Sequence, residues 1–181
     1  MIVALILPVV RPAMTGEPGA AAVAQSPVPD SADGEAFAVA RMVRGILSYV
    51  RWPDDSSTIR LCVAGDPRFA GRLGGMDTAS GRQILPHSLA AGETPADAGC
   101  DALYLGRMSP AARARLIGAA HDQPIVTIDE ADQSRRAGAM FCLSVDPARI
   151  SFQLDLDAVS RSRVRIDPKV LLLSRSREPG T

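Results

Sequence analysis

Short apolar runs typical of buried β-strands alternate with helical patterns along most of the chain, and two strand patterns follow each other directly near its end. Alternation with helices favours parallel strands, whereas two strands joined by a tight turn at Asp146-Pro147 form an antiparallel hairpin. We therefore predict a single α/β domain with a mixed β-sheet, helices on both faces and a C-terminal antiparallel hairpin. The predicted strands are Thr58 to Ala64, a weaker one at Arg82 to Pro86, Ala102 to Leu105, Pro124 to Ile128, Ala139 to Val145 and Ile150 to Leu156.

Two amphipathic helices are predicted between the strands. Apolar side chains recur at helical spacing from Glu35 to Val50, and Trp52-Pro53 ends this helix because proline disfavours helical conformation in the residue before it. Ser109-Pro110 pairs an N-cap residue with proline at the first helical position, which predicts a second helix as far as Ala120.

The last strand and the tail carry a two-sided pattern. Every second residue from Ile150 to Leu156 is apolar, so one face is predicted to join the core and the other to meet solvent or a partner. The following stretch predicts a helix, a break at Asp167-Pro168 and a last apolar turn from Val170 to Leu173.

The two ends of the chain have compositions unlike the centre. Residues 1–24 combine a short apolar run with Ala22-Val23-Ala24, the layout of a secretory signal peptide. No basic residue precedes the run, which is consistent with a true start upstream of Met1. Residues 25–34 are predicted to be a disordered leader, residues 35–176 the α/β domain and residues 177–181 a disordered tail. We therefore predict an exported, periplasmic protein.

Charge and hydropathy exclude two classes of function. The formal net charge is zero, which argues against nucleic acid as a partner because such a surface needs an excess of Lys and Arg. The longest apolar run, at the N-terminus, is about half of the ~20 residues that a transmembrane helix requires. Apolar residues make up 46% of the chain, enough for a core.

The sequence offers no convincing catalytic, cofactor or metal site. The strand end at Gly65 is not followed by the G-x-G-x-x-G spacing that cradles phosphates. His87 and His121 lack a neighbouring nucleophile and are interpreted as surface residues. The acidic residues Asp129, Glu130 and Asp132 lack calcium-loop spacing and are interpreted as a solvated face. We therefore predict a protein that is not an enzyme.

Three cysteines allow one disulfide and one remaining thiol. Cys62 lies within one predicted strand and Cys100 just before a neighbouring one, so a bridge between them would close a long Gly/Pro-rich loop. In the loop-entropy model this is worth roughly 4 kcal/mol. The alternative is two separate buried thiols. Cys142, between Phe141 and Leu143, is predicted to be a buried, unbridged thiol.

An ordered set of segments resembles the YfiR-like family of bacterial periplasmic proteins. The set consists of Ser48 to Pro53, Ile59 to Asp66, Gly81-Arg82, Cys100 to Leu105, Ile150 to Ala158 and the terminal apolar segment from Val164 to Ser174. The resemblance covers about Glu35 to Ser176. It implies that Cys62 and Cys100 occupy the disulfide positions of the family. A second bridge that some members have is absent here, because Cys142 has no partner cysteine.

The resemblance implies a regulator that acts by binding. Family members hold a membrane-bound diguanylate cyclase of the inner membrane inactive by contacting its periplasmic domain, which lowers cyclic di-GMP and disfavours biofilm. An OmpA-like outer-membrane lipoprotein can sequester the repressor in such systems. A second copy of the chain is a further candidate partner, in a homodimer.

Two residues are singled out as candidate partner contacts, and one other function is considered. Leu171 and Leu172 lie in the terminal apolar turn, and an exposed apolar patch marks a contact site; the alternative is that both belong to the core. The alternative function is a periplasmic small-ligand-binding sensor, which would use the loops at the strand ends near Gly65 and Asp129.

Overall fold

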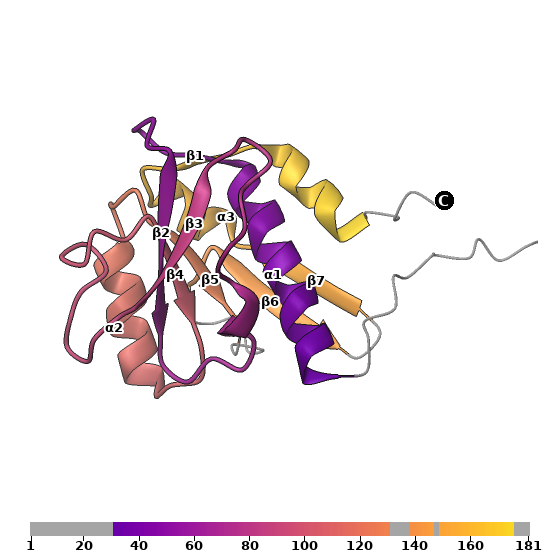
Figure 1. The fold of residues 1–181 in the computed structure, drawn as a ribbon. Helices are drawn as coiled ribbons and strands as arrows, with labels where there is room; N and C mark the ends of the chain where they lie inside the picture. The colour runs from indigo at the N-terminus through magenta and orange to yellow at the C-terminus, as the bar shows by residue number, and fades with distance from the viewer. Residues whose placement is uncertain (1–30, 131–137, 147–148, 176–181) are drawn as a thin grey trace, which may run out of the picture.

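Six strands form one twisted sheet in the order β3-β2-β4-β5-β6-β7 (Figure 1). The computed structural model describes residues 31–130, 138–146 and 149–175. Strands β3, β2, β4, β5 and β6 are parallel to their neighbours, and β7 runs antiparallel to β6. The mixed sheet and its C-terminal hairpin are therefore confirmed. The strands of this sheet are β2 (Thr58–Ala64), β3 (Gln83–Ser88), β4 (Ala102–Leu105), β5 (Val126–Asp129), β6 (Phe141–Asp146) and β7 (Arg149–Leu154).

Helices cover both faces of the sheet, as predicted. Helix α1 (Ala32–Ser48) packs on one face together with the two 3-10 segments, η1 (Ala70–Arg72) and η2 (Pro168–Arg175). Helix α2 (Pro110–Ala120) packs on the opposite face, and Figure 1 shows it on the far side of the sheet from α1. Because side chains alternate between the faces of a strand, the core is divided into two clusters.

The larger cluster lies beneath α1. Ile59 and Leu61 of β2, Tyr104 of β4 and Phe141 of β6 point into it, and none of them is exposed to solvent. The smaller cluster lies beneath α2, where Leu103 and its neighbours meet one face of a short helix. The face with more helical cover thus has the larger core.

Helix boundaries follow their caps. Ser31 Oγ accepts a hydrogen bond from the Gly34 N–H at 3.0 Å, so α1 begins three residues before the predicted Glu35. The predicted N-cap of the second helix is confirmed, because Ser109 Oγ accepts from the Ala112 N–H at 3.2 Å. Among the described residues, no helix has the length and hydropathy of a bilayer-spanning segment.

The end of the predicted last strand is wrong. Asp155 Oδ1 accepts from the Ala158 N–H at 3.0 Å and starts a short helix, α3 (Leu156–Ser160). Leu156 is therefore the first residue of a helix and is 72% exposed, rather than a core residue of the strand. The hydrogen bond by which Asp155 caps α3 outweighs the alternating apolar pattern that predicted a strand here.

A two-stranded sheet that the sequence did not predict fixes the segment that leads into η2. Strands β1 (Val50–Arg51) and β8 (Arg165–Ile166) pair antiparallel, and the Asp167 N–H donates to the Tyr49 carbonyl at 2.9 Å. Two-residue strands carry no periodic signal, so only the pairing reveals them. This pairing places η2 beside the C-terminal half of α1 (Figure 1).

Candidate partner-binding surface

The segment η2 brings two leucines to the surface. Val170 is fully buried, whereas Leu171 is 49% and Leu172 is 53% exposed. A 3-10 helix has three residues per turn, so Val170 and Leu173 share one side and the two residues between them share the other. Leu171 and Leu172 therefore face outward, as residues that contact a partner must. Their contact with a partner stays a prediction.

The position of η2 is fixed by its neighbours. A Cβ at Gly45 of α1 would lie 3.0 Å from both Cδ atoms of Leu173, so the absence of a side chain there lets η2 approach the helix. The Lys169 N–H donates to Asp167 Oδ1 at 2.9 Å and caps the segment. The two outward leucines are therefore presented on an anchored element, not on a loose tail.

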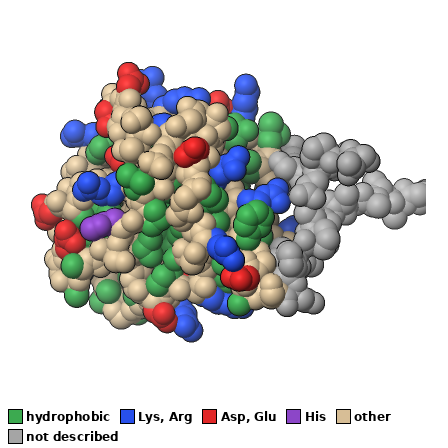
Figure 2. Space-filling view, viewed as in Figure 1, with side chains coloured by type: hydrophobic (Ala, Val, Ile, Leu, Met, Phe, Trp, Pro, Cys, Tyr) green, Lys and Arg blue, Asp and Glu red, His purple; other side chains and the backbone are tan. Residues whose placement is uncertain are grey.

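The surface around η2 is apolar with positive neighbours. Figure 2 shows hydrophobic side chains at the surface where η2 runs, with Lys and Arg side chains beside them. Elsewhere on this face, positive and negative side chains are interspersed, in keeping with the zero net charge. Exposed apolar side chains on an ordered element are a feature of protein contact sites.

The structure joins Cys62 and Cys100 in a disulfide, the pair that the sequence predicted. Both residues are buried, at 0% and 5% exposure, on the α2 face of the sheet. Next to the bridge, the Arg60 guanidinium donates to the Ala98 carbonyl at 2.8 Å. The disulfide and this hydrogen bond together attach the long loop before β4 to the middle of the sheet.

Cys142 lies on β6 and forms no disulfide. Its side chain is half-buried on the α2 face, whereas the sequence predicted a buried thiol. The difference arises because cover on that face thins out toward the hairpin, where Gln153, opposite Cys142 on β7, is exposed.

The two acidic residues at the end of β5 are buried, so their interpretation as a solvated face is wrong. Asp129 is 0% exposed and its Oδ2 lies 2.8 Å from Nε of Arg113 on α2. Glu130 is 9% exposed, and Asp132 lies outside the described residues. A buried carboxylate needs a charged or hydrogen-bonding partner, and here such partners come from residues distant in sequence. No local sequence pattern indicates them.

Glu130 is a structural acceptor. Its carboxylate accepts hydrogen bonds from the Arg68 and Phe69 N–H groups and from the Tyr104 hydroxyl, the last at 2.6 Å. Burial, followed by this hydrogen bond, raises the pKa of Tyr104 far above its ordinary value, so the phenol stays protonated and donates. These bonds tie the loop after β2 to strands β4 and β5.

The carboxyl edge of the parallel strands, where a sensor would bind its ligand, is packed with protein. Asp66 and Arg107 exchange backbone hydrogen bonds of 2.9 and 3.0 Å, and their side chains pair at 2.7 Å. A Cβ at Gly65 would lie 2.7 Å from the Arg107 carbonyl oxygen, and one at Gly106 would collide with the backbone of Pro67. The loops that open α/β sheets use for ligands therefore contact each other here.

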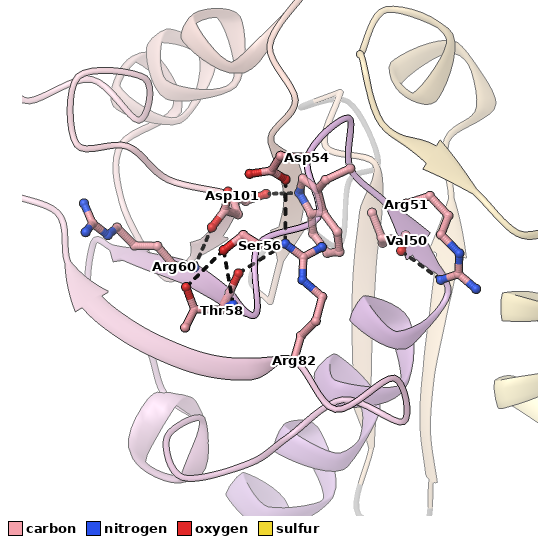
Figure 3. A network of polar contacts seen from close by, with 9 residues as sticks. Val50, Arg51, Asp54, Ser56, Thr58, Arg60, Arg82 and Asp101 are labelled. Atoms are coloured by element: carbon pink, nitrogen blue, oxygen red, sulfur yellow. Dashed lines mark hydrogen bonds and ion pairs between the residues drawn. The ribbon is translucent and has the colours of Figure 1, made fainter.

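A hollow of about 360 Å³ lies at the opposite end of the sheet, beside β1. The Arg82 guanidinium stacks 4.6 Å from the centre of the Trp52 ring and donates to the Thr58 carbonyl at 3.2 Å. Figure 3 shows the Asp54 carboxylate directed toward the Arg82 guanidinium, which it approaches to 3.7 Å, while Arg51 points away from them. The indole Nε1–H donates to the Asp101 carbonyl at 3.0 Å, so the cluster braces the start of β2 against β4.

The histidines lie apart from these features. His87 is exposed on the outer strand β3, and His121 is exposed at the C-cap of α2, as the sequence predicted. Within the described part of the chain, no three His, Cys, Asp or Glu side chains gather as a metal site would require. The exposed leucines of η2 thus remain the feature best suited to a partner.

A protein-family model matches most of the chain. The model described as YfiR/HmsC-like matches residues 37–175, which includes most of α1, the whole six-stranded sheet, the disulfide and η2. The matched range reaches from the first helix to the exposed leucines, so the candidate surface lies within the part that the family shares.

Proposed function

Because the chain belongs to the YfiR/HmsC-like family, we propose that it represses a membrane-bound diguanylate cyclase by contacting the periplasmic domain of that enzyme. The family consists of periplasmic regulators of cyclic di-GMP signalling, and it is regulatory rather than catalytic. Repression by this chain lowers cyclic di-GMP in the cell. An OmpA-like outer-membrane lipoprotein that sequesters the chain would release the cyclase.

The observation that carries the proposal is the presentation of Leu171 and Leu172 on an anchored segment inside the family range. A repressor of this kind needs a rigid contact surface more than a pocket, because a few side chains near the centre of an interface carry most of its affinity. The buried disulfide supports a periplasmic location, since such bonds persist in oxidising compartments. The packed carboxyl edge of the sheet favours this function over the ligand sensor.

The test combines a cellular and a binding measurement. Deleting the gene in its native host is expected to raise cyclic di-GMP, and the wild-type chain is expected to restore the lower level. The double variant Leu171→Asp, Leu172→Asp is expected not to restore it, because each aspartate would place a charge in an apolar contact. Crosslinking in intact cells is expected to capture the cyclase with wild type and to lose it with the double variant.

Leu85 provides a matched control. It is 44% exposed, close to the values of the two η2 leucines, but lies on β3 at the other side of the sheet. Leu85→Asp is expected to repress as wild type does. Full repression by the η2 double variant, with its disulfide and circular dichroism intact, would remove η2 as the contact surface. Unchanged cyclic di-GMP on deletion would remove the proposed function.

A further inference from the structure

The two segments that form the candidate surface carry exposed basic side chains and, beyond the first turn of α1, no acidic ones. Residues 36–48 of α1 and residues 168–175 of η2 contain neither Asp nor Glu. Arg41 and Arg44 are exposed on α1, and Lys169 is exposed on η2. We call these three residues the basic rim. In a chain whose formal net charge is zero, positive charge is thus concentrated on one surface.

The packing of η2 on α1 places the basic rim at the border of the exposed leucines. A Cβ at Gly45 would lie 3.0 Å from both Cδ atoms of Leu173, so η2 meets the helix at this glycine. Residues four apart share one side of an α-helix, which puts Arg41 one turn from this contact. Lys169 lies three residues before Leu172, a full turn of a 3-10 helix, so both face outward. Cations from two elements therefore lie beside one apolar contact.

The charges of the basic rim are not balanced within the described part of the chain. At the N-terminal end of α1, the Arg68 guanidinium lies 2.8 Å from the Glu35 carboxylate. By contrast, Arg44 and Lys169 take part in none of the ion pairs among the described residues. Neighbouring charges of one sign repel each other in the folded chain and attract a partner of the opposite sign. The basic rim is therefore suited to an acidic partner.

We propose that the basic rim contacts an acidic segment of the periplasmic domain of the cyclase, in which Asp and Glu side chains surround an apolar centre that meets Leu171 and Leu172. This inference rests on the proposed function and adds to it the charge of the partner surface. Opposite charges around an apolar centre speed association and fix the orientation of two proteins.

An anionic lipid surface would offer the same charge but is the poorer match. Binding of a helix to a bilayer interface increases with the apolar area that it buries. In η2, Val170 already packs in the core, so two leucines are left to enter a bilayer. A protein partner needs only a small apolar centre with matching charges around it.

Carbodiimide crosslinking tests the contact directly, because the reagent joins an amine to a carboxylate without a spacer. Lys169 is the only lysine of the chain, so a crosslink from a side-chain amine of this protein must pass through it. With the full-length cyclase, we expect mass spectrometry to find Nζ of Lys169 joined to an Asp or Glu of the periplasmic domain. Lys169→Arg keeps the charge and is expected to bind as wild type does, but to lose this crosslink.

Charge reversal tests the attraction. The double variant Arg44→Glu, Lys169→Glu is expected to associate about tenfold more slowly with the detergent-solubilised full-length cyclase at low salt. The rate for wild type is expected to fall as salt is added, because ions screen the attraction. Arg115→Glu is the matched control, since Arg115 is exposed on α2 on the opposite face of the sheet, and it should associate as wild type does. Circular dichroism and an intact disulfide verify that each variant is folded.

The outcomes separate this inference from the proposed function. If the charge-reversal variant associates as wild type does and Lys169 forms no crosslink, while Leu171→Asp, Leu172→Asp still abolishes binding, the inference is overturned and the proposed function stands. The inference also fails if charge reversal abolishes binding to phosphatidylglycerol vesicles and leaves binding to the cyclase unchanged. A wild-type chain that does not bind the cyclase would remove the proposed function and this inference with it.

Discussion

Asp101 shows at the scale of one residue how an ionisable group is used for structure. Its carbonyl accepts from the Trp52 indole, and its Oδ2 accepts from the Arg60 N–H at 2.7 Å (Figure 3). Burial raises the pKa of Asp101 above 3.8, and the hydrogen bond from Arg60 opposes this only in part. The carboxylate therefore lies partly buried beside the disulfide, and its ionised form lowers the stability of the folded protein.

This shift predicts a pH dependence of stability. Because the pKa of Asp101 is higher in the folded than in the unfolded chain, protonation favours folding. The resulting stability is complete below 3.8 and is lost as the pH rises through the pKa of the folded state. The free energy of unfolding of wild type, minus that of Asp101→Asn, is expected to fall over this range and then level off. Urea unfolding at a series of pH values measures it, and a difference that rises with pH would contradict the assignment.

At the scale of elements, η2 depends on packing and not on its own helical propensity. It is anchored by the β1–β8 pairing and by Leu173, which packs on the larger core cluster beside Gly45. The same three-residue repeat that buries Val170 and Leu173 exposes the two leucines between them. Leu171 and Leu172 therefore face outward because the opposite side of η2 packs on the core.

This arrangement predicts different results for neighbouring leucines. Leu173→Ala is expected to lower the free energy of unfolding by about 1–3 kcal/mol, somewhat less than for a fully buried leucine, and to loosen η2. Leu172→Ala is expected to change it by less than about 0.5 kcal/mol, because its side chain is largely exposed. Denaturant unfolding gives the energies, and hydrogen exchange of residues 165–173 reports the docking. Equal effects of the two variants would contradict the orientation of η2.

At the scale of the whole molecule, the disulfide compensates for a segment with few core residues of its own. Between β3 and β4, the loop contributes only Ala98, Cys100 and the partly buried Leu89 to the smaller cluster. A covalent link from Cys100 to β2 holds this loop on the sheet, where the α2 face would otherwise be open. The link restricts the unfolded chain more strongly because the loop that it closes is long.

Removing the link is therefore expected to cost the molecule much of its stability. The double variant Cys62→Ala, Cys100→Ala should lose about 2–5 kcal/mol in urea unfolding. Wild type in the presence of a reductant should approach the double variant, whereas Cys142→Ala should unfold as wild type does in oxidising buffer. Unchanged stability of the double variant would show that the loop is held by its hydrogen bonds alone.

The fold class and most elements could be predicted because their signals are local. The alternation of Ile59, Leu61 and Val63 identifies β2, and the Ser109-Pro110 pair identifies the start of α2. The candidate contact residues could also be named, since an apolar turn at the end of a chain stands out in the sequence. What failed were positions whose environment is supplied by distant residues, such as Asp129 with Arg113 and Glu130 with Tyr104.

Periodicity and spacing by themselves determined an α/β sheet with helices on both faces, a late hairpin and cysteines placed where strands adjoin. Only the tertiary structure decided that Leu171 and Leu172 face outward, that two carboxylates are buried, and that the two-residue strands β1 and β8 pair. The reason is physical. Hydrophobic periodicity acts over neighbouring residues, whereas burial of a charge or pairing of two short strands depends on groups that folding brings together from far along the chain.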